Sequence, residues 1–451
     1  MIRDMPHNAS TAGLFLLSRM TVIIGTALFA AALTGCATGT APKEAVVEVT
    51  PDSGSLQDAA DRVAEGGTIV LGAGTYRDSM TIKTRDVTVR GSDRNETIID
   101  GEGQRPLGIV GIADGVRVEN LTVTGATLYG VLITGTHDEN GADVTGISGY
   151  EQFDPEKFPA TQRFAVDHVT AYNNGLYGIY AFNAKNGIIK DSYASGSADS
   201  GFYVGQCQQC NIAVTGNVAE RNAVGFENAN ASDSLVLTGN RFTDNRVGMT
   251  LLSNYQEAFT PQRGNVVAGN VISENQTSQS PSQADGGFGT GIGISGGQDN
   301  TITANRIENN ARSAVIFAST EDLPSTGNRL TDNLISGSPV TAANISSGRA
   351  PASANCLSPA GTALPVGFAA ELSRACDGEK IQQSSASADQ LPGPSAPVGM
   401  SFLEVPAPKA QPQMDDPGTS RDPLPDEMQL PDVTHIAVPD AGLLVALTGV
   451  R

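Results

Sequence analysis

The sequence contains no tryptophan, and aromatic residues make up only 5% of its 451 positions. Basic residues are also scarce, because 28 Lys and Arg stand against 48 Asp and Glu, which gives a formal net charge of −20. This balance argues against a nucleic-acid partner, since binding to phosphates needs a basic surface. The 51 glycines, beside so few aromatic residues, indicate a globular chain with many short turns and small core layers.

The apolar run near the N-terminus is too short to span a bilayer. It covers residues 22–33, follows Arg19 and is typical of the hydrophobic region of an export signal. It leads into the tetrad LTGC, residues 33–36, which resembles the lipobox of bacterial lipoproteins. The resemblance implies a signal peptide at 1–35, lipidation of Cys36 and anchoring to a membrane outside the cytoplasm. An ordinary secretory signal followed by a chance cysteine is the alternative.

Five cysteines are an odd number for an exported protein. If Cys36 carries the lipid, four remain, and closeness in sequence selects Cys207–Cys210 and Cys356–Cys376 among the possible pairings. The spacing of Cys207-Gln-Gln-Cys210 also resembles a redox motif, but that motif needs a helix N-terminus to lower the thiol pKa. We therefore predict two structural disulfides in an oxidising compartment, and no metal site.

The chain then changes from a tether at residues 36–51 to a repeating pattern. Residues 53–67 have apolar positions at helical spacing and end in Gly-Gly, which predicts one short amphipathic helix. Further on, TGNVAERNAVGF at 215–226 returns as TGNRFTDNRVGM at 238–249. Glycines that open an apolar triplet stand at positions 178, 201, 225 and 248, so the period is 23 or 24 residues.

A period of this length with several short strands per unit is the signature of a solenoid. Three short parallel strands per turn fit best. The recurring asparagines, such as Asn217, Asn240 and Asn270, are expected at the corners. There the backbone would be left-handed and the amides would bond to their copies one coil away. Two polar insertions, at about 137–163 and 254–290, are predicted to be surface loops.

With its cap helix, its GGTIVLGAGTY opening at 66–76 and its 23-residue coils, the chain resembles the right-handed parallel β-helix proteins, the fold of pectate lyases and their relatives. The resemblance covers roughly residues 52–340 and implies an all-β solenoid of about ten coils. Residues 341–451 hold the second cysteine pair, a short helical candidate and a Pro-rich acidic tail. The tail is expected to be either solvated or laid along the coils, with partial docking favoured.

In this fold, ligands usually lie across one sheet face between long loops, so the outward residues of the glycine-led strand are the candidates. Strand alternation places Ile179 and Phe202 inside, and Tyr180, Phe182 and Tyr203 outside on adjacent coils. Exposed aromatic rings on a flat sheet would stack against sugar rings; the alternative is that an insertion or the tail covers them. The remaining candidates for carbohydrate contact are Glu227 in the same row and the loop residues His137 and Asp138.

The catalytic motifs of the related enzymes are not found. The mannuronan epimerase motif Tyr-Gly-Phe-Asp-Pro-His-Asp is reduced to YGIYAFN at 177–183, and the Gly-His-Gly of polygalacturonases does not occur. Of the pectate lyase strand only Asp167-His168 remains. Glu227 has no evident second carboxylate on a neighbouring coil, because Asp199 resembles a turn residue. No catalytic residue is predicted, and calcium at an Asp or Asn turn is the one cofactor left open.

These features predict an exported, membrane-anchored β-helix protein that binds or remodels a polysaccharide or cell-envelope glycan. A non-catalytic surface scaffold or adhesin is the alternative from another class. A lyase, epimerase or glycoside hydrolase with an unrecognised site is a third. The negative charge favours a neutral or calcium-bridged glycan over a bare polyuronate. The oligomeric state is left open.

Overall fold

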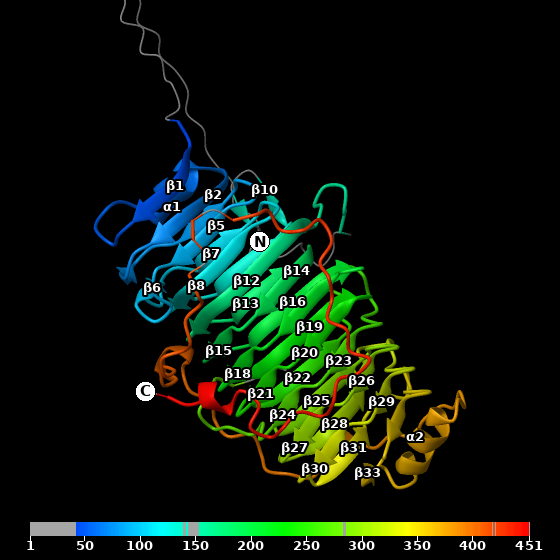
Figure 1. The fold of residues 1–451 in the computed structure, drawn as a ribbon. Helices are drawn as coiled ribbons and strands as arrows, with labels where there is room; N and C mark the ends of the chain where they lie inside the picture. The colour runs from blue at the N-terminus through cyan, green and yellow to red at the C-terminus, as the bar shows by residue number, and fades with distance from the viewer. Residues whose placement is uncertain are drawn as a thin grey trace, which may run out of the picture. The chain divides into compact units, whose positions relative to one another are not determined.

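The computed structural model describes residues 42–138, 141–142, 153–282, 286–416, 418–419 and 421–450. Within this part, the chain winds into stacked coils whose parallel strands form two large sheets (Figure 1). Sheet B has eleven strands in one ladder, and each coil contributes one of them. The number of coils is therefore close to the ten expected. Its strands are β4 (Met80–Ile82), β7 (Leu107–Gly111), β9 (Tyr129–Thr134), β13 (Tyr177–Phe182), β16 (Ser200–Gln208), β19 (Val224–Ser232), β22 (Val247–Leu252), β25 (Thr290–Ser295), β28 (Ser313–Ala318), β31 (Val340–Asn344) and β33 (Ala363–Leu364).

Sheet A combines two ladders that share the long strands β8 (Arg117–Thr124) and β12 (Thr161–Tyr172). The first ladder also contains β1 (Glu44–Val49), β2 (Val63–Leu71), β5 (Thr88–Gly91), β14 (Ala184–Lys190), β17 (Ile212–Thr215), β20 (Leu235–Thr238), β23 (Val266–Ala268), β26 (Thr301–Thr303), β29 (Arg329–Thr331) and β32 (Cys356–Ser358). The second contains β3 (Gly74–Tyr76), β6 (Thr97–Asp100), β15 (Tyr193–Ser195), β18 (Val218–Glu220), β21 (Arg241–Thr243), β24 (Val271–Ser273), β27 (Arg306–Glu308) and β30 (Leu334–Ser336).

The core fills the inside of the coils with inward-pointing apolar side chains, in rows that run from coil to coil. Ile179, Phe202, Phe226, Met249 and Ile292 follow the strand-opening glycines, and all are almost fully buried in the same hydrophobic cluster. The predicted inward positions are therefore confirmed. Burying each of these side chains contributes roughly 1.5–3 kcal/mol relative to leaving it exposed.

The repeated asparagines form buried ladders at the corners, as the repeat predicted. Asn217 donates from its backbone N–H and its Nδ2 to Asn240 Oδ1, both at 3.0 Å, and Asn240 repeats this bond to Asn270. The backbone expectation was wrong by one residue. The left-handed conformation belongs to the residue before each ladder asparagine, for example Gly216 and Gly239, both with φ of 68°. The ladder asparagines themselves have ordinary backbone conformations.

Short helices close the two ends of the coil stack. The predicted helix near residue 56 is α1 (Leu56–Arg62), which is capped by Ser55 and buries Leu56 against the first coils. At the other end, α2 (Phe368–Cys376) buries Phe368 in the same core. The coils extend beyond the predicted range, because β1 begins inside the segment expected to be a tether and β33 lies past residue 340. No helix within the described residues is long and apolar enough to cross a membrane.

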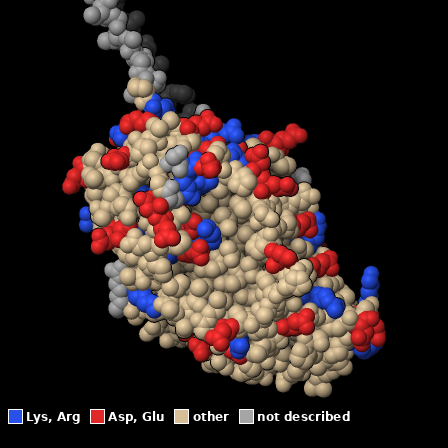
Figure 2. All heavy atoms as spheres, viewed as in Figure 1, with Lys and Arg blue, Asp and Glu red and all other residues tan. Residues whose placement is uncertain are grey.

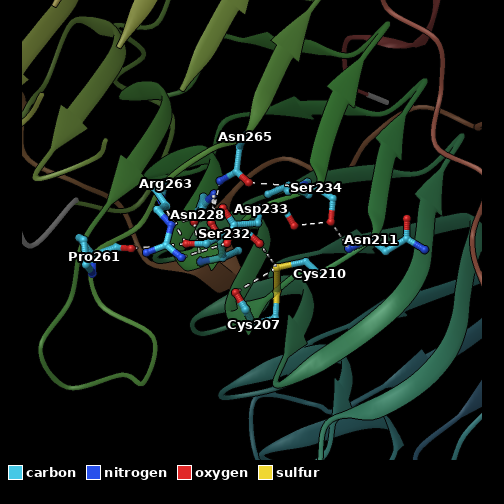
Figure 3. The surroundings of a disulfide bond; sticks show 12 residues. Cys207, Cys210, Asn211, Asn228, Ser232, Asp233, Ser234, Pro261, Arg263 and Asn265 are labelled. Atoms are coloured by element: carbon cyan, nitrogen blue, oxygen red, sulfur yellow. Dashed lines mark hydrogen bonds and ion pairs between the residues drawn. A yellow bond between two sulfur atoms is a disulfide. The ribbon is translucent and has the colours of Figure 1, made fainter. Parts of the chain in front are cut away.

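Both predicted disulfides are present. Cys356–Cys376 joins β32 to α2 and so fixes the terminal helix to the last coils. Cys207–Cys210 closes the corner after β16, where Cys210 Sγ lies 3.2 Å from the carbonyl oxygen of Ser232 (Figure 3). Ser232 in turn accepts from the backbone N–H of Arg263 at 3.0 Å, so this disulfide lies close to the first part of the second insertion.

The C-terminal segment after residue 390 is docked along the coils, coloured orange to red in Figure 1. It has almost no regular structure, apart from the short 3₁₀ turns Phe402–Glu404 and Val445–Leu447. A set of arginines holds it by donating to its backbone carbonyls: Arg90 to Gly418, Arg94 to Pro412, Arg117 to Asp422, Arg241 to Ala441 and Leu443, Arg246 to Pro397, Arg306 to Pro439 and Arg312 to Pro394. Docking is therefore more extensive than the partial docking expected.

Charged side chains are unevenly spread over the surface. On the face seen in Figure 2, an uncharged area occupies the middle, and Lys, Arg, Asp and Glu gather mainly around it. Several arginines lie beneath the C-terminal segment; Arg94, for example, is only 1% exposed. The accessible surface is thus more acidic than the composition alone indicates.

Candidate functional site

The outer face of sheet B carries one continuous row of side chains, because its strands pair in register from coil to coil. The row contains, in stacking order, Leu132, Tyr180, Tyr203, Glu227, Thr250, Gly293 and Ile316. Its first half is aromatic and apolar, and its second half begins with a carboxylate. The two halves differ in what covers them.

The aromatic half brings the predicted residues together but does not expose them. The ring centroids of Tyr180 and Tyr203 lie 4.8 Å apart, and those of Tyr180 and Phe182 lie 5.3 Å apart. Tyr129 and Tyr177 complete the cluster. Tyr180 is only 8% exposed and Tyr203 only 2%, so the expectation of an open stacking platform is wrong. The alternative of a covered cluster is correct.

The cover is the beginning of the second insertion, residues 253–262, here called the covering loop. Its Glu257 carboxylate accepts a hydrogen bond from the Tyr203 hydroxyl, and its Ala258 N–H donates to Gln206 Oε1 at 3.0 Å. Phe259 of the same loop packs edge-on against Phe153 of the first insertion, with 5.7 Å between the ring centroids. The two insertions therefore meet above the aromatic residues.

The carboxyl group of Glu257 lies in an unusually buried environment for an acid. The residue as a whole is half-buried, but its Oε2 atom is buried and has no hydrogen-bond partner among the described residues. Gly205 makes this close approach possible, because a Cβ there would lie 2.4 Å from the Tyr203 ring and 3.1 Å from Glu257 Oε2. Burial raises the pKa of Glu257 from its ordinary 4.5 to about 8, although the Tyr203 hydrogen bond opposes this. A carboxyl group with this pKa is mainly protonated at pH 7.

The second half of the row is open and forms a groove of about 410 Å³. Its floor is the outer face of β19, β22, β25 and β28, where Gly293 contributes no side chain. Val224, Val247, Leu252 and Ile316 are among its apolar lining residues. Volume and lining are in the range typical of pockets that bind small organic groups.

Two carboxylates lie together at one part of this groove. Asp199, just before β16, and Glu227 on β19 both line it. The buried Ser200 hydroxyl joins them, since Ser200 Oγ is 2.5 Å from Glu227 Oε2 and 3.4 Å from Asp199 Oδ1. The expectation that Glu227 has no acidic neighbour is therefore wrong. The signal was Asp199 at the turn one coil earlier, but a turn aspartate is so common that sequence alone did not distinguish it.

The groove also has a cationic residue and a wall from the C-terminal segment. The Arg312 guanidinium lines the groove and donates to the carbonyl oxygens of Phe288, at 2.8 Å, and Pro394, at 3.2 Å. Ala388 and Leu391, which lie close to Pro394 in sequence, line the groove as well. The C-terminal segment thus borders the groove without filling it.

The remaining predicted candidates lie elsewhere. His137 and Asp138 form β10 (His137–Asp138), which pairs with β11 (Gly141–Ala142), and neither is among the described residues that line the groove. Cys36 lies outside the described residues. A further acidic group, Asp167, His168 and Asp191, comes together on sheet A, but Lys190 Nζ lies 3.0 Å from an Asp167 carboxylate oxygen. This ammonium already compensates the charge that a cation would.

Comparison with known proteins supports the fold. A family model described as a right-handed beta helix region matches residues 107–260. The chain thus has the right-handed parallel β-helix fold that the resemblance implied. No curated protein sequence matches it significantly.

Solved structures with a similar fold include three polysaccharide-active enzymes. The A-module of a mannuronan C-5 epimerase from Azotobacter vinelandii is 15% identical over 63% of this chain and 90% of its own, with a TM-score of 0.42. An alginate lyase from Paenibacillus is 14% identical over 68% and 98%, with a TM-score of 0.40. The catalytic unit of an α-1,3-glucanase from Streptomyces thermodiastaticus is 13% identical over 69% and 68%, with a TM-score of 0.42. These likenesses concern the fold alone.

Proposed function

We propose that the groove on the outer face of sheet B binds a polysaccharide chain. The observation that carries this proposal is the pairing of Asp199 and Glu227 at one part of an otherwise largely apolar groove. A sugar ring presents hydroxyl donors at its edge and C–H groups on its faces. Carboxylates accept strong hydrogen bonds from such hydroxyls, while Val247 and Ile316 offer apolar contact to the faces.

The charge of the chain selects among polysaccharides. The formal net charge is −20, and the two groove carboxylates add local negative potential. The Arg312 guanidinium, a single positive charge beside these two acids, gives two of its five N–H donors to carbonyl groups. A neutral glycan therefore suits the groove better than a bare polyuronate, which the acidic surface would repel.

A second candidate, hydrolysis of the bound glycan, is favoured by the same pair of acids. Glycoside hydrolases use two carboxyl groups that flank the scissile bond, one as acid and one as base or nucleophile. Ser200 holds the Asp199 and Glu227 carboxylates near each other, as such a pair requires. Neither matches a catalytic motif that the sequence resembles, so binding is the primary proposal.

Export and anchoring complete the proposed role. The tetrad at 33–36 is proposed to direct lipidation of Cys36, which would hold the protein at a membrane outside the cytoplasm. The two disulfides support an oxidising compartment. At such a location, cell-envelope and extracellular glycans are the accessible polymers.

The test is a glycan array with the purified protein, followed by product analysis of every glycan that binds. Glu227→Gln and Asp199→Asn should each weaken binding by about tenfold or more, since a hydrogen bond to a charged group contributes roughly 1.5–3 kcal/mol. Glu65→Gln, an exposed acid on β2, is the matched control and should bind like the wild type. Released oligosaccharides would establish hydrolysis. A wild-type protein that binds no glycan would favour the scaffold or adhesin alternative instead.

A further inference from the structure

The buried aromatic half and the open groove are two parts of one surface. Tyr203 and Glu227 are direct partners on the adjacent strands β16 and β19, so their side chains stand side by side on the same face. Glu227 lines the open groove, whereas Tyr203 lies under the covering loop. Removing that loop would therefore lengthen the groove by the width of at least the two coils that carry Tyr203 and Tyr180.

The two ends of the covering loop are fixed to the coils, since Ser253 donates to Ser295 O and Gly296 O and Gln262 donates to Asn300 Oδ1. Its middle, around Glu257, is held by polar contacts. Besides the bonds from Tyr203 and to Gln206, Asn230 Nδ2 donates to the carbonyl oxygens of Asn254, at 2.6 Å, and Glu257, at 3.0 Å. At the centre of this contact lies the Glu257 carboxyl, with its buried Oε2 unpaired among the described residues. A neutral carboxylic acid tolerates such a place, but a carboxylate without a compensating partner is strongly disfavoured there.

We propose that the aromatic cluster of Tyr177, Tyr180, Phe182 and Tyr203 is a second, closable section of the glycan groove, and that the covering loop uncovers it when the Glu257 carboxyl loses its proton. The glycan part of this inference rests on the proposed function. The loop movement does not.

Burial outweighs the groups that face Glu257, although the hydrogen bonds from the Tyr203 hydroxyl and the Gln206 backbone favour its carboxylate and oppose release. On sheet B the facing groups are the hydroxyl-bearing rings of Tyr177, Tyr180 and Tyr203, whose own pKa values burial raises well above 10, so they stay neutral. Glu227 on β19 is a further acid on the same face. From the first insertion, Phe153 and Phe158 approach the loop, and the Lys157 ammonium lies over the Phe158 ring at 4.9 Å from its centroid.

The sign of the pH effect follows from linkage. In the closed loop the Glu257 pKa is about 8, whereas an exposed glutamic acid has 4.5. The closed state therefore holds the Glu257 proton more tightly than the open state does. Above the pKa of the exposed acid, closing requires the carboxylate to take up a proton, which disfavours the closed loop. As pH rises, each unit up to the closed-state pKa favours the open loop by a factor of about ten. Between pH 6 and pH 9, the open population should rise about a hundredfold.

The ligand class follows from the residues that are uncovered. Aromatic side chains with one polar edge bind flat, partly apolar rings, and they contribute more than other residues to most binding surfaces. A glycan chain that already lies along Glu227 would continue onto Tyr203 and Tyr180 without leaving the sheet. The open state should therefore bind longer chains more tightly than short ones.

The loop movement is tested by hydrogen exchange of the Ala258 amide, which is bonded to Gln206 in the closed state. After correction for intrinsic rates, the wild type should exchange about a hundredfold faster at pH 9 than at pH 6. Glu257→Gln, which stays neutral, should show no such rise. Tyr203→Phe removes the hydrogen bond that favours the carboxylate and should move the rise to higher pH. Equal pH profiles for the wild type and Glu257→Gln would overturn the proposal.

The binding role is tested on the full chain with cellohexaose, laminarihexaose, maltohexaose and the corresponding disaccharides. The wild type should bind the preferred hexaose at least tenfold more tightly at pH 9 than at pH 6, with the disaccharide unchanged and Glu257→Gln insensitive to pH. If the loop opens at high pH but the hexaose binds no more tightly, the aromatic cluster is not a second section of the groove. Absence of binding at both pH values would instead show that the proposed function itself fails, and the glycan part would fall with it, whereas the exchange result would stand.

Discussion

At the scale of single residues, the ladder asparagines join each coil to the next at its corners. Each of them is buried yet uses both its donor and its acceptor. Asn245, for instance, donates to Ala219 O, Thr243 O and Asn275 Oδ1, and accepts two bonds from Asn222. The repeat of Asn in the sequence therefore reflects the hydrogen bonds that each coil makes with the next.

Replacing Asn245 by alanine should therefore be costly. The change would orphan the buried N–H of Asn222 and the buried carbonyl of Ala219, and each buried unsatisfied group costs about 1–3 kcal/mol. We expect a loss of about 3 kcal/mol in the free energy of unfolding, measured by urea denaturation followed by circular dichroism. Gln279→Ala, an exposed amide in the second insertion, is the control and should change stability by less than about 0.5 kcal/mol. Equal effects of the two changes would contradict the ladder's role.

At the scale of elements, the sequence contained enough to predict the strands but not their covering. Strand alternation correctly separated Phe202, inside the coils, from Tyr203, outside them. It says nothing about what lies above an outward residue, and the cover comes from Glu257, more than fifty residues later. A sugar platform and a buried aromatic cluster have the same sequence pattern. The same limit hid Asp199, whose neighbour Glu227 is on the next coil.

The docked C-terminal segment shows a second kind of long-range contact. Proline lacks a backbone N–H, so a Pro-rich segment offers the coils mainly carbonyl acceptors. The side chains that hold it are correspondingly arginines, such as Arg241 and Arg306, which bind Ala441 and Pro439. The composition of the tail, which cannot build a core of its own, predicted either a solvated segment or partial docking along the coils. It could not show that the coils supply both the core and the arginine donors.

Removing these donors should release the end of the segment. We expect the double variant Arg241→Ala, Arg306→Ala to increase hydrogen exchange and proteolytic cleavage across residues 436–450, because each lost bond leaves a carbonyl with only solvent as its partner. The coils themselves should keep their melting temperature within a few degrees, since their core is untouched. Arg329→Ala, an exposed arginine of β29, is the matched control. Unchanged exchange in the double variant would show that apolar contacts hold the segment instead.

At the scale of the whole molecule, charge and location act together. The formal net charge of −20 is concentrated on the accessible surface, because several arginines are used beneath the C-terminal segment. Such a surface repels anionic polymers, which agrees with the proposal that the groove on sheet B binds a neutral glycan. A protein of this kind needs a separate means of staying near its ligand, which the proposed lipid supplies.

The proposed lipid anchor at Cys36 leads to a prediction about membrane association. The first coil begins with Glu44, only eight residues after Cys36, and eight extended residues reach about 28 Å at most. The lipid would therefore tether the coils close to the membrane surface, where envelope glycans are dense. In fractionated cells, the wild type should enter the detergent phase, whereas Cys36→Ala should leave it, because the acyl chains that make anchoring stable would be missing. Cys376→Ala, which removes a cysteine outside the lipobox, should stay in the detergent phase. If Cys36→Ala also stays there, the membrane association has another cause and the lipobox interpretation is wrong.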